Sequence, residues 1–106
     1  MKNPHIIGVS FTGSSKAGAY ISEVAGRYLK RSVLELGGND PFLVLADADL
    51  ELAVDQAVKA RTANAGQVCF SPKRFVVVKE VYDTFRAKLV EKLNQVKYGN
   101  PRDAET

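Results

Sequence analysis

Segments of strand length alternate with segments that carry an apolar stripe at helical spacing, and this alternation most restricts the fold of the 106-residue chain. Four apolar runs have the length of strands, at residues 6–12, 32–36, 42–45 and 74–79. Three stretches carry apolar residues at helical spacing, at residues 21–29, 50–58 and 81–97. The resulting order, β-α-β-β-α-β-α, predicts the α/β fold class.

Turn-forming residues separate these segments. We expect a Gly/Ser turn over 13–18, a second turn over 37–41, and a break in the middle helix at 64–67. Gly99 and Pro101 should end the last helix. Within this pattern only the pair Gly37-Gly38 marks a candidate domain boundary.

The predicted strands are apolar on both sides, which is typical of a sheet that is covered on both faces. A chain of 106 residues with three helices can cover few of those faces by itself. We therefore expect an oligomer, or a segment of a longer protein.

Charge and composition exclude several classes of function. The chain has 15 Lys and Arg and 12 Asp and Glu, a net charge of +3, but the basic residues are scattered and form no stripe with interleaved aromatics. We read them as a solvated surface and expect no nucleic-acid partner. No apolar run reaches the roughly 20 residues of a membrane span. The first residues do not form a secretory signal, so we expect a cytoplasmic protein without a membrane partner.

Cys69 is the only cysteine, which excludes an intrachain disulfide and a zinc site built from several cysteines. A lone cysteine is most often a small buried hydrophobic residue. Cys69 follows the loop-forming segment 64–68, however, and reactive side chains concentrate in loops, so it is also a candidate nucleophile. The only histidine, His5, lies near the terminus, and no sequence feature pairs it with Cys69. No spacing suggests a metal site.

Glu35 is an acidic residue within an apolar strand, Leu34-Glu35-Leu36. It could face water on a half-buried strand. Alternatively it ends the strand at a cleft, where desolvation would raise its pKa and suit a general base. The pattern leaves both interpretations open.

The turn from Gly13 to Gly18 contains Lys16 and lies between a strand and a helix, an arrangement that can bind an anion at the helix N-terminus. It lacks the Gly-Lys-Ser/Thr ending of a P-loop and differs from the Gly-x-Gly-x-x-Gly dinucleotide fingerprint. Taken alone, this signal is weak.

Taken together, the motifs resemble the NAD(P)-dependent aldehyde dehydrogenase superfamily. The resemblance rests on four motifs in the same order and spacing, at residues 11–14, 34–39, 47–50 and 64–69. The combination of Leu-Glu-Leu-Gly-Gly with Gly-Gln-x-Cys is highly specific, and the match covers essentially the whole chain. Residues 39–42 and 73–77 look most like the succinate-semialdehyde dehydrogenase branch.

The resemblance implies roles for both chemical residues. Cys69 would attack the aldehyde carbonyl and carry the thioester that follows oxidation, and its backbone amide would form part of an oxyanion hole. Glu35 would be the general base that activates the hydrolytic water. Val68 and Phe70 would line the aldehyde pocket.

The resemblance also implies a cofactor, NAD or NADP. Its binding residues would be Gly13, Ser14, Gly18 and Leu36. Gly13 and Ser14 would approach the phosphates, Gly18 would permit close helix packing, and Leu36 would lie beside the nicotinamide.

The implied fold is a piece of the aldehyde dehydrogenase fold. Residues 1–37 would end the Rossmann-like cofactor domain and residues 38–106 would begin the α/β catalytic domain. Enzymes of the family are several times longer, so much of the binding apparatus lies outside these residues and we expect little turnover from this chain. Two alternatives remain: a catalytically silent piece that oligomerises or binds a partner, and a cofactor-independent cysteine esterase.

Overall fold

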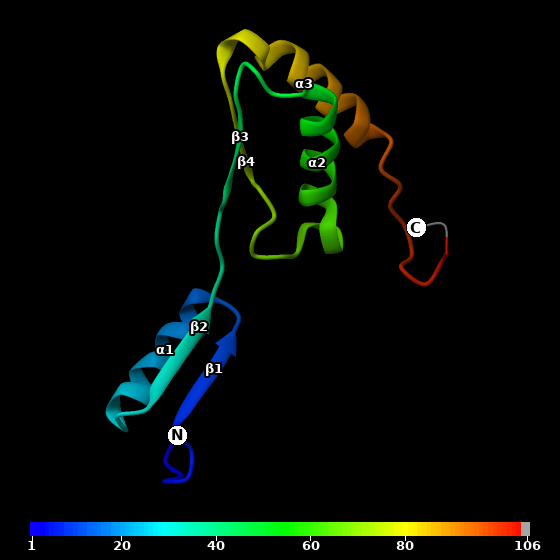
Figure 1. Ribbon diagram of the computed structural model, residues 1–106. Coiled ribbons are helices and arrows are strands. Elements are labelled where there is room, and N and C mark those ends of the chain that lie inside the picture. The colour runs from blue at the N-terminus through cyan, green and yellow to red at the C-terminus, as the bar shows by residue number, and fades with distance from the viewer. Residues whose placement is uncertain (105–106) are drawn as a thin grey trace. The chain divides into compact units, whose positions relative to one another are not determined.

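The structure is a computed structural model that describes residues 1–104, and its element order confirms the predicted α/β class (Figure 1). The elements are β1 (Gly8–Thr12), α1 (Ser15–Arg27), β2 (Arg31–Glu35), β3 (Pro41–Val44), α2 (Leu50–Thr62), the 3₁₀ turn η1 (Ala63–Gly66), β4 (Arg74–Val77) and α3 (Lys79–Asn94). The chain divides into two compact units, Met1–Gly38 (unit 1) and Asn39–Thr106 (unit 2). This division falls beside the predicted boundary after residue 37, and the assignment of the units to cofactor and catalytic domains stays a prediction.

Unit 1 is a β-α-β unit. Strands β1 and β2 are parallel, in a register that runs from Gly8 opposite Arg31 to Thr12 opposite Glu35. Helix α1 connects them and packs against the sheet, and its buried residues are Gly18 and Ala25. Parallel neighbours need such a crossover because the chain must return to the starting edge before it can form the second strand.

Helix α1 begins earlier and ends earlier than the sequence predicts. Ser14 caps it, and its side chain accepts a hydrogen bond from the Ala17 amide at 3.2 Å, so most of the predicted turn is helical. The predicted stripe also included Leu29, which is wrong: Leu29 lies beyond the helix with φ 51° and is 95% exposed. The chain reverses there because the Lys30 amide donates to the Ala25 carbonyl, which closes the helix end.

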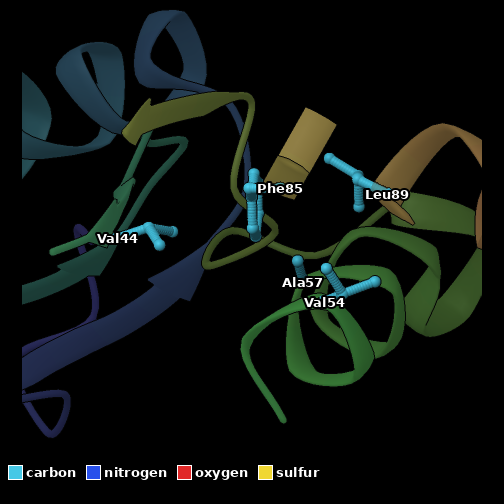
Figure 2. Close-up of a cluster of buried hydrophobic side chains, with 5 residues drawn as sticks. All are labelled: Val44, Val54, Ala57, Phe85 and Leu89. Carbon is cyan, nitrogen blue, oxygen red and sulfur yellow. The ribbon is translucent and has the colours of Figure 1, made fainter. Parts of the chain in front are cut away.

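Unit 2 contains the hydrophobic core. Strands β3 and β4 are parallel, from Pro41 opposite Arg74 to Val44 opposite Val77. Helices α2 and α3 pack against each other, and together with one face of this sheet they enclose the buried side chains in Figure 2, which are Val44, Val54, Ala57, Phe85 and Leu89. Phe75 links sheet and helix, with ring centroids 5.5 Å from Phe42 and 6.3 Å from Phe85.

The two helices of unit 2 differ in how well their limits are predicted. Helix α2 starts at an N-cap, Asp49, whose carboxylate accepts from the Glu51 and Leu52 amides, as acidic residues at this position suggest. Helix α3 ends at Asn94, so the predicted extension toward residue 97 is wrong. Val96 lies outside the helix because its amide turns back to the Leu93 carbonyl.

Each two-stranded sheet has apolar side chains that no helix covers. Leu43 and Val76 are opposite each other in the β3–β4 register and are 63% and 53% exposed. Val33 on β2 is 60% exposed. This confirms that the helices of this chain cover only part of its strand surface.

No helix in residues 1–104 is long and apolar enough to cross a membrane.

Candidate functional site

The two candidate chemical residues lie in different units. Glu35 ends β2 in unit 1, whereas Cys69 lies on the loop between η1 and β4 in unit 2. Each half of the candidate site is therefore described within its own unit.

In unit 1, the predicted cofactor-binding residues and Glu35 gather at one edge of the sheet. Thr12 and Glu35 are opposite each other at the carboxyl ends of β1 and β2, and the Gly13 amide donates to the Glu35 carbonyl at 3.0 Å. Ser14 is the second residue after β1, and Leu36 directly follows β2. The carboxyl edge of parallel strands is where α/β proteins bind their ligands.

Gly18 is placed at this edge by close packing. A Cβ atom on Gly18 would lie 2.5 Å from the Cδ2 atom of Leu36, so a larger residue at this position would require the Leu36 side chain or α1 to move. A Cβ on Gly13 would lie 2.5 Å from the ring of Phe11. The start of α1 therefore lies beside the end of β2, and the donors of a first helical turn suit an anion.

The Glu35 side chain is exposed within unit 1. The sequence leaves open whether Glu35 faces water or a cleft, and within unit 1 it faces water. A cleft around the carboxylate would have to be formed by residues beyond unit 1.

Cys69 lies on a tightly folded loop. Three consecutive residues after α2 have left-handed backbone, Asn64 (φ 49°), Ala65 (φ 56°) and Gly66 (φ 75°). The Gln67 amide then donates to the Asn64 carbonyl at 3.1 Å. In a second turn the Ser71 amide donates to the Val68 carbonyl at 3.2 Å. Cys69 is inside this second turn with an exposed thiol, not a buried hydrophobic residue.

Two polar residues behind this loop were missed by sequence reasoning. Ser71 is fully buried, and its hydroxyl accepts a hydrogen bond from Arg61 Nη1 at 2.6 Å and donates one to the Arg61 carbonyl at 3.2 Å. Arg61 Nη1 also donates to the Gly66 carbonyl at 3.5 Å. The residues are ten positions apart, so no helical or strand period relates them. The only available signal is an arginine that follows the apolar stripe of α2.

Val68 and Phe70 flank Cys69, as the predicted aldehyde pocket requires, and Phe70 is 59% exposed while Val68 is partly buried. An open hollow of about 820 Å³ on unit 2 does not include them. It lies between the end of α2 and the segment after α3, and its lining includes Asn64, Gln67 and Tyr98. The assignment of Val68 and Phe70 to a substrate pocket stays a prediction.

Within residues 1–104, no group of three or more His, Cys, Asp or Glu side chains is arranged to hold a metal ion.

The structure thus combines a β-α-β unit, whose strand ends meet the start of a helix, with an α/β unit that presents a cysteine on a strained loop. Residues 1–106 match the aldehyde dehydrogenase family, and the chain belongs to that family.

Relatives with known names support the assignment. The chain is 50% identical over 105 residues to a succinate semialdehyde dehydrogenase [NAD(P)+] from Escherichia coli, covering 99% of this chain and 23% of that protein. It is 45% identical over 106 residues to a succinate-semialdehyde dehydrogenase [NADP(+)] from Mycobacterium avium, covering 100% of this chain and 22% of that protein.

A solved structure has the same fold. The succinate-semialdehyde dehydrogenase from Burkholderia pseudomallei superposes with a TM-score of 0.91 at 39% identity, covering 96% of this chain and 21% of that one. The chain therefore spans less than a quarter of the length of the relatives that it matches.

Proposed function

We propose that this chain carries the nucleophile and the general base of an aldehyde dehydrogenase that oxidises a small aldehyde, succinate semialdehyde, to the carboxylic acid with NAD or NADP. We further propose that it acts in the cytoplasm and self-associates. The observation that carries the proposal is the edge of unit 1, where the Gly13 amide bonds to the Glu35 carbonyl and the start of α1 meets the end of β2. The names of the relatives supply the substrate and cofactor.

The residues present at this edge fit a nicotinamide dinucleotide. Gly13 and Ser14 place the start of α1 at this edge, where the amides of a first helical turn suit phosphate, and Gly18 packs that helix on Leu36. When bound, the cofactor would accept the hydride. The chain's own contribution at this edge is to bind phosphate and to place the Leu36 backbone beside the ring.

Cys69 would supply the covalent chemistry. Its thiolate sulfur adds to the aldehyde carbon, and the carbonyl oxygen becomes an oxyanion that accepts a hydrogen bond from the Cys69 amide. Loss of hydride from that carbon leaves an acyl thioester on sulfur. The exposed thiol, presented on a turn, is accessible for this attack.

Glu35 would complete the reaction. Its carboxylate takes a proton from water, the water oxygen attacks the thioester carbon, and the carbon–sulfur bond breaks to release the acid and the Cys69 thiolate. This step requires Glu35 to be enclosed with the thioester, which is why the proposal concerns the longer enzyme and not this chain alone.

A segment exchange tests the proposal. The chain would replace the corresponding segment of the E. coli relative, with which it is 50% identical over 105 residues. We expect the chimera to oxidise succinate semialdehyde with NAD(P), and Cys69→Ser to abolish this activity. Glu35→Gln should preserve a stoichiometric burst of NAD(P)H but slow steady turnover about 10²–10⁴-fold.

Substitution of the exposed His5 by Gln is the control and should leave the chimera active. A folded chimera that turns over normally with Cys69→Ser would contradict the proposal.

A second function is favoured by the exposed apolar residues Leu43 and Val76. In this alternative the chain is a catalytically silent piece that self-associates. The chimera distinguishes the two functions: a folded chimera that forms no NAD(P)H favours the silent piece, and turnover that is lost in Cys69→Ser excludes it. Cleavage of an activated ester without cofactor, lost in the same variant, would indicate the esterase instead.

A further inference from the structure

The loop that carries Cys69 is held from behind by one side chain. Arg61, near the C-terminal end of α2, donates from a single nitrogen, Nη1, to Ser71 Oγ at 2.6 Å and to the Gly66 carbonyl at 3.5 Å. Gly66 lies three residues before Cys69 and Ser71 two residues after it. The guanidinium therefore contacts the loop on both sides of the nucleophile.

The contact between Arg61 and Ser71 consists of two hydrogen bonds with opposite donors. The Ser71 hydroxyl, with no exposed surface, accepts from Arg61 Nη1 and donates to the Arg61 carbonyl at 3.2 Å. The same carbonyl and Nη1 are the atoms that a Cβ on Gly66 would meet, at 2.9 and 2.5 Å. The loop backbone thus lies directly on Arg61, with space for a glycine only.

The loop needs such support because its own backbone is unfavourable. Left-handed φ angles at Asn64 and Ala65 are uncommon for residues with a Cβ, and conformations of this kind persist only where surrounding contacts hold them. The backbone hydrogen bonds within the loop are short-range turns, whereas the Arg61–Ser71 pair connects it to a helix that packs in the core.

We propose that Arg61 and Ser71 form a clamp that positions the Cys69 nucleophile. Arg61 acts through the loop and is a positioning residue, and this inference rests on the proposed role of Cys69. A charge-assisted hydrogen bond to a buried hydroxyl is among the stronger polar contacts, and its loss leaves a buried polar group unsatisfied. Without the clamp the turn at 68–71 should open more often while the core of α2 and α3 stays folded.

The test uses the 106-residue chain and two readouts at the loop. The first is hydrogen exchange of the Ser71 amide, which the Val68 carbonyl protects. The second is the ¹⁹F spectrum of a trifluoromethyl label on Cys69, the only thiol. In Arg61→Met we expect Ser71 to exchange about 10–100-fold faster and the ¹⁹F line to broaden or split, with amides of the core positions Val54 and Leu89 unchanged.

Arg86→Met is the matched control, because Arg86 is an exposed arginine on α3, and it should leave both readouts as in the unmodified chain. Arg61→Lys, which keeps the charge and one donor group, should restore part of the protection. Unchanged exchange and an unchanged ¹⁹F line in Arg61→Met would overturn the proposal.

If Arg61→Met unfolds unit 2 as a whole, Ser71→Ala decides, since it deletes only the hydroxyl. Faster exchange confined to the loop in Ser71→Ala supports the clamp, and exchange like that of the unmodified chain overturns it. Acylation of Cys69 by p-nitrophenyl acetate, measured by intact mass, tests the nucleophilic role of Cys69 separately from the clamp. An intact clamp around a thiol that never acylates would count against the role of Cys69, not against the clamp.

Discussion

At the scale of single residues, small side chains matter where two backbone segments approach each other. Gly66 lies on the Arg61 backbone with no space for a Cβ, and a Cβ on Gly18 would displace the Leu36 side chain. Gly26, in contrast, is a helical glycine with open space around it. The sequence motif containing Gly18 predicts close packing through the family resemblance, but the partner, Leu36, is found only once the strand and helix are in place.

Replacement of Gly18 by Val should destabilise unit 1. The added side chain must displace Leu36 or move α1, and overpacking of this kind costs about 1–3 kcal/mol. Ala19→Val is the matched control at the exposed neighbouring position, where only a small loss of helix propensity is expected. Urea unfolding followed by circular dichroism measures both, and equal effects of the two substitutions would show that Gly18 is not required for close packing.

At the scale of elements, α2 and α3 are connected by apolar packing and by two ion pairs, Glu51–Lys88 and Asp55–Lys92. The hydrogen bond from the Lys92 ammonium lowers the pKa of the Asp55 carboxyl below 3.8. The same bond raises the pKa of Lys92 above 10.5. Both side chains are partly exposed to solvent, so the pair adds only modestly to the packing.

The Asp55–Lys92 pair should stabilise unit 2 only in a defined pH window. The carboxyl's contribution is present above about pH 3.8 and is lost as pH falls through its lowered pKa in the folded chain. The ammonium's contribution is present below about pH 10.5 and is lost as pH rises through its raised pKa. Thermal midpoints of the unmodified chain and of Lys92→Met should therefore differ near neutral pH and converge at both extremes. A constant difference across the whole range would disprove this coupling.

Secondary structure was predicted well where periodicity and capping agree. Val54 and Ala57 of the predicted stripe are buried, and Asp49 caps α2. The errors fall at two helix ends, at Leu29 and at Val96, and α3 ends before the Gly99 and Pro101 that were expected to stop it. Local hydrogen bonds back into the last turn end these helices. The apolar spacing of the sequence continues beyond these ends but does not extend the helices.

At the scale of the molecule, the chain carries more apolar strand surface than its helices cover. The residues Leu43 and Val76 form an exposed cross-strand pair on the β3–β4 sheet. Exposed apolar surface and unpaired strand edges favour association.

We predict that the isolated chain self-associates through this pair. Leu43→Glu combined with Val76→Glu should lower the mass in sedimentation velocity, because two charges would have to be buried in the interface. Val90→Glu, at an exposed apolar position on α3, is the control and should leave the oligomer intact. A monomeric mass for the unmodified chain at working concentration would contradict the prediction.

The α/β class, the element order and the identity of Cys69 and Glu35 as candidates follow from the sequence, because apolar periodicity, turn residues and short motifs are local properties of the chain. The grouping of Gly13, Ser14, Glu35 and Leu36 at one sheet edge depends on the parallel register of β1 and β2. The clamp of Arg61 on Ser71 likewise depends on how the chain returns from the end of α2 to β4. Contacts between residues far apart in sequence have no period and leave no local pattern, so they emerge only when the chain is folded.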